Sequence, residues 1–66
     1  MRIRIVRGDK VQMLSLRKGA TAGDVFKKLA LHPDAYIAMM SNRPVPLTKE
    51  IKDGEEVRIV KVASGG

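Results

Sequence analysis

The chain contains no cysteine and no tryptophan, and it has one tyrosine and one phenylalanine among its 66 residues. Without cysteine, neither a disulfide nor a thiolate metal site can reinforce the fold. One histidine, His32, cannot by itself complete a metal site or a histidine-based triad. We interpret His32, which stands before Pro33, as a surface loop residue. These absences exclude disulfide-stapled scaffolds and the common zinc sites, so we expect no metal.

Long apolar runs are absent as well. No stretch approaches the roughly 20 apolar residues that a membrane span requires. The first residues, Met1 to Val6, alternate arginine with apolar side chains, whereas a signal peptide has a continuous apolar segment. We therefore expect a cytoplasmic protein without a membrane partner. Its length predicts one small domain, which buries only about 60% of its unfolded surface.

Acidic residues are few in the first half of the chain. Residues 1–33 carry eight basic and two acidic residues, whereas residues 34–66 carry five of each sign, so the first half supplies the net charge of +6. Such asymmetry indicates either a nucleic-acid or acidic protein partner or simply a solvated, lysine-rich surface. The basic residues of this half are Arg2, Arg4, Arg7, Lys10, Arg17, Lys18, Lys27 and Lys28.

Two strand patterns open the chain. Residues 2–6 alternate with a period of two, residues 8–10 have turn chemistry, and residues 11–16 form a second β-like run. Together they predict a hairpin. We expect Ile3, Ile5, Leu14 and Leu16 on its core face, with Val11 and Met13 on the opposite face.

A helix is predicted over residues 22–30. Thr21 is a good N-cap, and Asp24 three residues later completes a short capping box. Pro33 ends the helix by about Leu31. Two lysines near its C-terminal end face water, where the helix dipole favours cations. One apolar stripe contains Ala22, Val25, Phe26 and Leu29.

The second half predicts three further extended segments. Residues 36–40 are a short apolar strand, and residues 43–47 hold two prolines that restrict them to a sheet edge. Between these segments, Ser41 and Asn42 suit a tight turn, since asparagine tolerates a positive φ. Residues 48–56 are polar apart from the anchor Ile51 and include a turn at Asp53-Gly54. The last strand, residues 56–62, alternates, with Val57 and Ile59 inward.

This order of elements predicts a two-layer α+β domain in which one helix lies across a mixed sheet of four to five strands. With the Ser41–Pro46 turn, the Asp53–Val57 segment and the terminal Ala63-Ser64-Gly65-Gly66, the chain resembles the ubiquitin-like β-grasp superfamily over essentially all 66 residues. It is most similar to prokaryotic sulfur carriers of the ThiS and MoaD type and to archaeal small modifiers. Its length and its Arg43–Pro46 segment resemble most closely the tRNA-thiolation carriers and the archaeal ubiquitin-like modifiers. The basic charge departs from many of these relatives, which are acidic.

The resemblance implies a β-grasp domain over residues 1–62 and a flexible tail over residues 63–66. In this family an E1-like enzyme uses ATP to adenylate the terminal carboxylate, here that of Gly66. Gly65 lacks a Cβ and gives clearance in a narrow channel, and Ala63 and Ser64 complete the tail. The acyl-adenylate then becomes a thiocarboxylate that delivers sulfur to a biosynthetic enzyme, as in tRNA thiolation, or it forms an isopeptide bond to a lysine of a target protein. Both routes stay open, as does the final product: thiolated tRNA, thiamin, molybdopterin or a tagged protein.

On this interpretation the chain is a monomeric carrier, with no catalytic residues and no bound cofactor. A partner-binding patch is expected on the sheet face away from the helix, formed by Arg58, Val60 and Val62. Met39 joins it if Tyr36, Ala38 and Met40 point inward; otherwise Met39 is core and Val60 an isolated surface residue. Possible acceptors for self-conjugation are Lys10, Lys27, Lys28, Lys49, Lys52 and Lys61.

The alternative function is a small basic nucleic-acid-binding domain. Arg2, Arg4 and Arg7 on one strand, near Lys10, Arg17 and Lys18, have the charge to follow a phosphate backbone. Aromatic platforms for base stacking are nearly absent, and Phe26 belongs to the helix stripe. For the carrier we expect no direct contact with nucleic acid.

Overall fold

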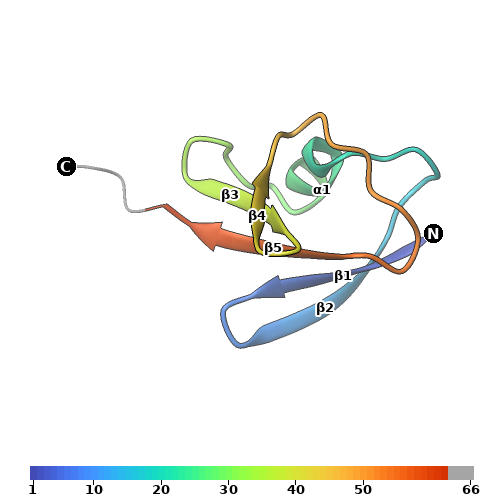
Figure 1. The fold of residues 1–66 in the computed structure, drawn as a ribbon, viewed down its shortest axis with the longest axis horizontal. Coiled ribbons are helices and arrows are strands. Elements are labelled where there is room, and N and C mark those ends of the chain that lie inside the picture. Colours follow the sequence, from blue (N-terminus) through green and yellow to red (C-terminus); the bar gives the residue numbers. More distant parts are fainter. Residues whose placement is uncertain (63–66) are drawn as a thin grey trace.

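The computed structural model describes residues 1–62, which form one five-stranded sheet and one helix (Figure 1). The order of strands in the sheet is β2-β1-β5-β3-β4. The elements in chain order are β1 (Arg2–Arg7), β2 (Lys10–Ser15), α1 (Ala22–Lys28), β3 (Tyr36–Met40), β4 (Arg43–Val45) and β5 (Glu56–Lys61). This order is the predicted one.

The sheet is mixed, as predicted. Its central pair, β1 and β5, is parallel, with Arg4 opposite Glu56 and Val6 opposite Arg58. The three other neighbouring pairs are antiparallel. Since β1 and β5 come from opposite ends of the chain, the parallel pair joins the first and the last described strands at the centre of the fold.

The hydrophobic core lies between α1 and one face of the sheet. The hairpin faces are confirmed: Leu14 is buried, while Val11 and Met13 are exposed on the other face. Leu16 lies just beyond the end of β2 and is half-buried against the core. The largest fully buried side chains are Ile3, Ile5, Val25, Ile51 and Val57.

Ile51 fastens the long polar segment between β4 and β5. Its side chain is 1% exposed, as expected of the one apolar anchor in that segment. Its backbone N–H donates to the carbonyl oxygen of Ala20 at 2.9 Å. Full burial of an isoleucine contributes about 1.5–3 kcal/mol, so this residue holds an otherwise solvated loop against the start of α1.

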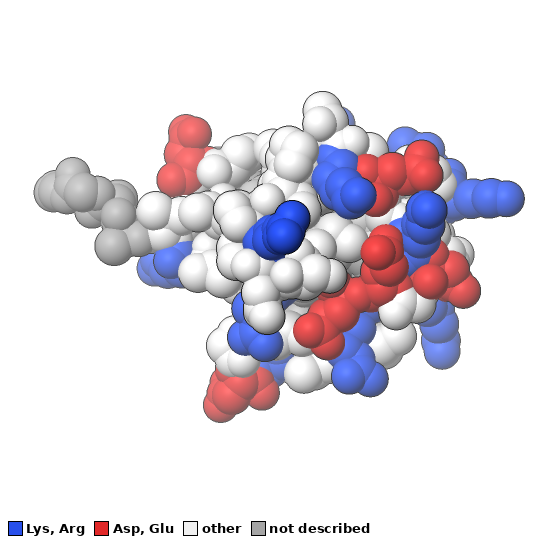
Figure 2. All heavy atoms as spheres, in the orientation of Figure 1, with Lys and Arg blue, Asp and Glu red and all other residues white. Residues whose placement is uncertain are grey.

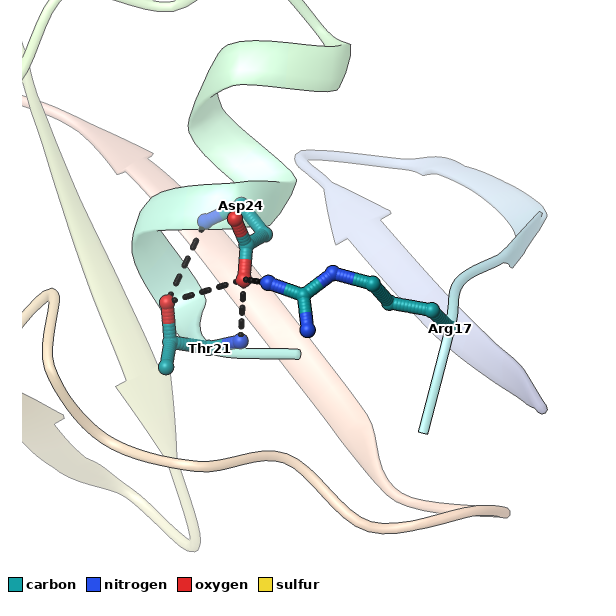
Figure 3. Close-up of polar contacts among 3 residues, drawn as sticks. All are labelled: Arg17, Thr21 and Asp24. Carbon is teal, nitrogen blue, oxygen red and sulfur yellow. Dashed lines mark hydrogen bonds and ion pairs between the residues drawn. The ribbon is translucent and has the colours of Figure 1, made fainter. Parts of the chain in front are cut away.

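The capping box at the start of α1 is present (Figure 3). The Thr21 N–H donates to Oδ2 of Asp24 at 2.8 Å, and the Asp24 N–H donates to Oγ1 of Thr21 at 3.4 Å. The guanidinium of Arg17 lies 3.5 Å from the same carboxylate oxygen. The pKa of Asp24 is lowered, chiefly by the Thr21 N–H; partial burial opposes this, and the Thr21 hydroxyl, Arg17 and Lys27 add to it.

The helix ends at Lys28, two residues before the predicted end, and Leu29 is its C-cap. Ala30 follows in the left-handed region, with φ of 56°. The Leu31 N–H donates to the Phe26 carbonyl at 2.8 Å, and the Ala30 N–H donates to the Lys27 carbonyl at 3.2 Å. These two bonds form a Schellman motif, in which glycine usually occupies the place of Ala30. The backbone therefore stops the helix ahead of Pro33.

The turn between β3 and β4 has two residues, Ser41 and Asn42, with φ of 53° and 63°. Positive φ at both positions is the geometry that matches the twist of a two-residue hairpin. The predicted positive φ is thus confirmed, and it extends to the serine. β4 is at the edge of the sheet, where Pro44 is tolerated.

Candidate partner-binding face

The side chains of β3 show whether Met39 points into the core or to the outer face, which the sequence left open. Ala38 and Met40 are buried at 2% and 8% exposure, and Tyr36 is half-buried against the core. Successive strand residues point to opposite faces, so Ile37 and Met39 lie on the face away from α1. In β5, Val57 and Ile59 are buried, and Arg58 and Val60 are exposed on that same outer face.

The strand register brings these side chains together. Met39 lies opposite Arg58, and Ile37 lies opposite Val60. Val62, half-buried, directly follows β5 and donates its N–H to the carbonyl of Ala35 at 2.8 Å. We refer to the resulting surface, Ile37, Met39, Arg58, Val60 and Val62, as the outer patch.

Of the predicted patch residues, Met39 and Arg58 are therefore cross-strand partners, and Val60 lies on the same face as Arg58 one alternation further along β5. Ile37 was missing from the prediction, although its side chain is 39% exposed, comparable with 41% for Val60. Ile37 is two residues from Met39 in the same strand, so both side chains point to the same face. Knowing which face Met39 occupies would therefore have added Ile37 to the predicted patch. Whether the patch binds a partner stays a prediction.

A hollow of about 520 Å³ adjoins the outer patch beside the β3–β4 turn. Met39 and Arg58 line it from the patch, Asn42 lines it from the turn, Glu56 from the start of β5, and Glu55 from the residue before that strand. The patch therefore combines an apolar surface with charges of both signs at its border.

The basic residues do not form one continuous track along β1. Arg2 and Arg4 are exposed and alternate with the buried Ile3 and Ile5, whereas Arg7 has the opposite orientation. The guanidinium of Arg7 lies 5.7 Å from the ring centroid of Tyr36. On the face shown in Figure 2, acidic side chains lie among the basic ones, most densely toward the right of the view. Charge on β1 is thus divided between the two faces of the sheet.

Potential metal-ligating side chains are scattered over residues 1–62. No group of three or more His, Asp or Glu side chains in this range is arranged to hold a metal ion, and His32 is exposed, as predicted for a loop residue. The helical segment of this range falls short of the length and apolar character that a membrane crossing requires. The predicted tail residues Ala63, Ser64, Gly65 and Gly66 lie outside the described residues.

Comparison with known families gives a match over residues 1–63 to the model of small archaeal modifier protein 2. The chain belongs to this family. A protein of Archaeoglobus fulgidus is 27% identical over 66 residues, with 100% of this chain and 97% of that protein covered. The small archaeal modifier family is thus matched along almost the whole sequence.

Solved structures confirm the ubiquitin-like β-grasp fold. A ubiquitin from Caldiarchaeum subterraneum is 26% identical, with a TM-score of 0.77 over 100% of this chain and 98% of that one. SAMP1 from Haloferax volcanii is 17% identical, with a TM-score of 0.76 and full coverage of both chains. The chain spans 40% of ATBAG1, solved in complex with HSP70, at 17% identity and a TM-score of 0.78. The fold prediction and the family resemblance are confirmed.

Proposed function

We propose that this small archaeal modifier is activated at the carboxylate of Gly66 by an E1-like adenylating enzyme. The observation that carries the proposal is the position of the outer patch on the strand that leads to the tail. Arg58 and Val60 belong to β5, and Val62 is the last described residue before position 63. Ubiquitin-like modifiers as a class interact with E1-like enzymes and with targets, which supports the same conclusion.

The short distance along the chain between Val62 and Gly66 keeps the terminal carboxylate near the outer patch. Four residues span at most about 14 Å, so the Gly66 carboxylate stays within that distance of Val62. An enzyme that docks on the outer patch thereby holds the reacting group close to its own ATP site. Binding energy gathered away from the reacting atoms is then used to position them, which is how docking surfaces accelerate reactions.

The proposed chemistry needs no catalytic group from this chain. A Gly66 carboxylate oxygen attacks the α-phosphorus of ATP, and pyrophosphate leaves. In the sulfur route, an enzyme persulfide displaces AMP from the acyl-adenylate, and a thiol reduces the resulting acyl disulfide to release the thiocarboxylate. In the conjugation route, a lysine amine displaces AMP and loses a proton to form an isopeptide bond. The protein is a substrate in both routes, and ATP is bound by its enzyme.

The test is ATP–pyrophosphate exchange with an adenylating enzyme from the same cell. We expect exchange that depends on the full-length chain and disappears when Gly66 is removed. Equal exchange without Gly66, or none with the full-length chain, would contradict the proposal.

Mass spectrometry of protein recovered from its native cell, both intact and after digestion to peptides, distinguishes the two routes. Replacement of one terminal oxygen by sulfur indicates sulfur transfer, and Ser-Gly-Gly remnants on lysines indicate conjugation. Salt-dependent binding to RNA, unchanged when Gly65 and Gly66 are deleted, would instead favour the nucleic-acid alternative.

A further inference from the structure

The end of β5 has a strand neighbour on one side only. The parallel pairing of β1 with β5 runs from Arg4–Glu56 to Val6–Arg58. On its other side β5 stays paired with β3 as far as Lys61, which lies opposite Tyr36. In Figure 1 the β1–β2 hairpin bends away from β5 toward its turn. Within residues 1–62, the edge of residues 59–61 that faces β1 is therefore open to another strand.

A hollow of about 410 Å³ lies beside this open edge. We refer to it as the β5 notch. It combines an apolar floor with three cations, and its main lining side chains are Arg7, Tyr36, Arg58, Ile59, Val60 and Lys61.

In the described part of the chain, no carboxylate lies within 4.0 Å of a cation of the notch, although Arg58 shares the hollow beside the outer patch with Glu55 and Glu56. The ion pair found there at 4.0 Å or less, Arg17–Asp24, lies at the start of α1. No acidic side chain lines the notch, although Asp9 is close by in the β1–β2 turn, where it shares a separate hollow with Arg7 and Lys10. The notch therefore presents positive charge beside an open strand edge.

We propose that the β5 notch binds an extended acidic segment of a partner protein, which adds as a strand along residues 59–61. The open edge supplies main-chain hydrogen-bonding groups, as in other cases of strand addition. By the alternation of β5, Lys61 lies on the same side as Tyr36, and Arg58 lies on the other. In an added strand with alternating side chains, the acidic ones on one face reach Arg7 and Lys61, and the apolar ones on the other face lie beside Val60.

The structure favours a peptide over RNA as the occupant. The regular spacing of N–H and C=O groups along a strand edge matches the backbone of an extended peptide. The one aromatic ring of the notch, that of Tyr36, already has the guanidinium of Arg7 over it at 5.7 Å. That contact occupies a ring face on which a base would stack. RNA binding is therefore an outcome that would overturn the inference.

The experiment is NMR titration of the full-length chain with a capped peptide of alternating glutamate and valine, about six residues long, a typical strand length. We expect saturable binding, with amide shifts centred on Gly8, Ile59 and Lys61. The same peptide N-methylated at alternate amides, and a lysine–valine peptide, should not bind. No saturable binding up to about 1 mM, shifts centred elsewhere, undiminished binding of the N-methylated peptide, or tighter binding of an oligouridylate at the same residues would each overturn the inference.

Paired variants test the cations. Arg7→Gln with Lys61→Gln should weaken peptide binding by roughly tenfold, because two exposed ion pairs are lost. Arg43→Gln with Lys49→Gln removes the same charge elsewhere and should change affinity by less than about twofold. Equal losses in both pairs would mean nonspecific attraction and contradict the inference.

Each free variant is first shown to be folded by its amide spectrum. If the first pair unfolds, Lys61→Glu alone, at an exposed position, provides the same test. The titration uses neither ATP nor an activating enzyme, so its result is independent of the chemistry proposed for Gly66.

Discussion

At the scale of single residues, the reaction proposed for Gly66 can be tested separately from the stability of the fold. The buried core that the structure describes is built from residues between Ile3 and Ile59. We predict that deletion of Gly66 changes the free energy of unfolding by less than about 0.5 kcal/mol, as for surface changes away from packed groups. The same deletion should abolish adenylation. Urea denaturation and pyrophosphate release measure the two effects, and loss of the fold on deletion would refute this separation.

Met39 provides a test of the outer patch. We predict that Met39→Asp leaves the chain folded and weakens docking of the activating enzyme by about tenfold or more, because an apolar contact is replaced by a desolvated charge. The matched control is Met13→Asp. Met13 is 53% exposed on β2, and β1 separates it from β5. Steady-state kinetics of ATP–pyrophosphate exchange report the change as a raised KM for the carrier. An equal effect of both substitutions would argue against a localised patch.

At the scale of the helix, the residue after the C-cap has a backbone conformation that residues other than glycine disfavour. A non-glycine residue in the left-handed region costs about 1–2 kcal/mol, and glycine loses more entropy on folding by about 0.4–1 kcal/mol. Ala30 is in this region, with φ of 56°. We therefore predict that Ala30→Gly stabilises the protein by about 0.5 kcal/mol, measured as a higher midpoint of denaturation at unchanged m-value. Ala35→Gly, where φ is not positive, should destabilise.

The N-terminal cap of the helix makes stability depend on pH. The pKa of Asp24 is lower in the folded chain, mainly because the Thr21 N–H donates to its carboxylate. A carboxyl whose pKa falls on folding stabilises the fold above its unfolded pKa of about 3.9 and loses that contribution as the pH falls through the folded value.

We therefore predict that Asp24→Asn lowers the Tm at pH 7 and that the difference from wild type shrinks below about pH 4. Thermal melts followed by circular dichroism across this range measure it. A difference between the two proteins that stays constant with pH would show that the carboxylate charge is not involved.

At the scale of the whole molecule, the excess of positive charge repels itself. The net charge is +6, and the structure describes one ion pair, at Arg17. Screening should therefore stabilise the fold. We predict that the Tm rises when sodium chloride is increased from about 10 mM to about 150 mM.

A variant with a lower net charge tests whether self-repulsion causes the salt effect. Neutralising Lys27, Lys49 and Lys52 to glutamine removes half of the net charge of +6, so this variant should show a smaller rise in Tm with salt. If wild type and variant respond equally, self-repulsion is not the cause of the salt effect.

Local patterns in the sequence were sufficient for the elements and their order. Alternation identified the faces of β1, β2 and β5, and the pair Thr21 and Asp24 identified the start of the helix, because each of these signals acts within a few residues. Element ends were less accurate: the helix stops at Lys28 because a Schellman motif with Ala30 at its left-handed position forms there, and sequence alone gives alanine no preference for that conformation. The orientation of residues 36–40 was open because every residue there is apolar, so no contrast between faces exists to be read.

Pairing between strands that are distant in the sequence decided which side chains lie next to one another on the sheet. The sequence by itself determined the small modifier fold and its charge, since these follow from residue types and short-range pattern. Only the tertiary structure placed Ile37 and Met39 beside Val60 and Arg58, and only it left one edge of residues 59–61 open next to Arg7. Register between segments separated by many residues depends on how the whole sheet closes over the helix, and no local preference encodes it.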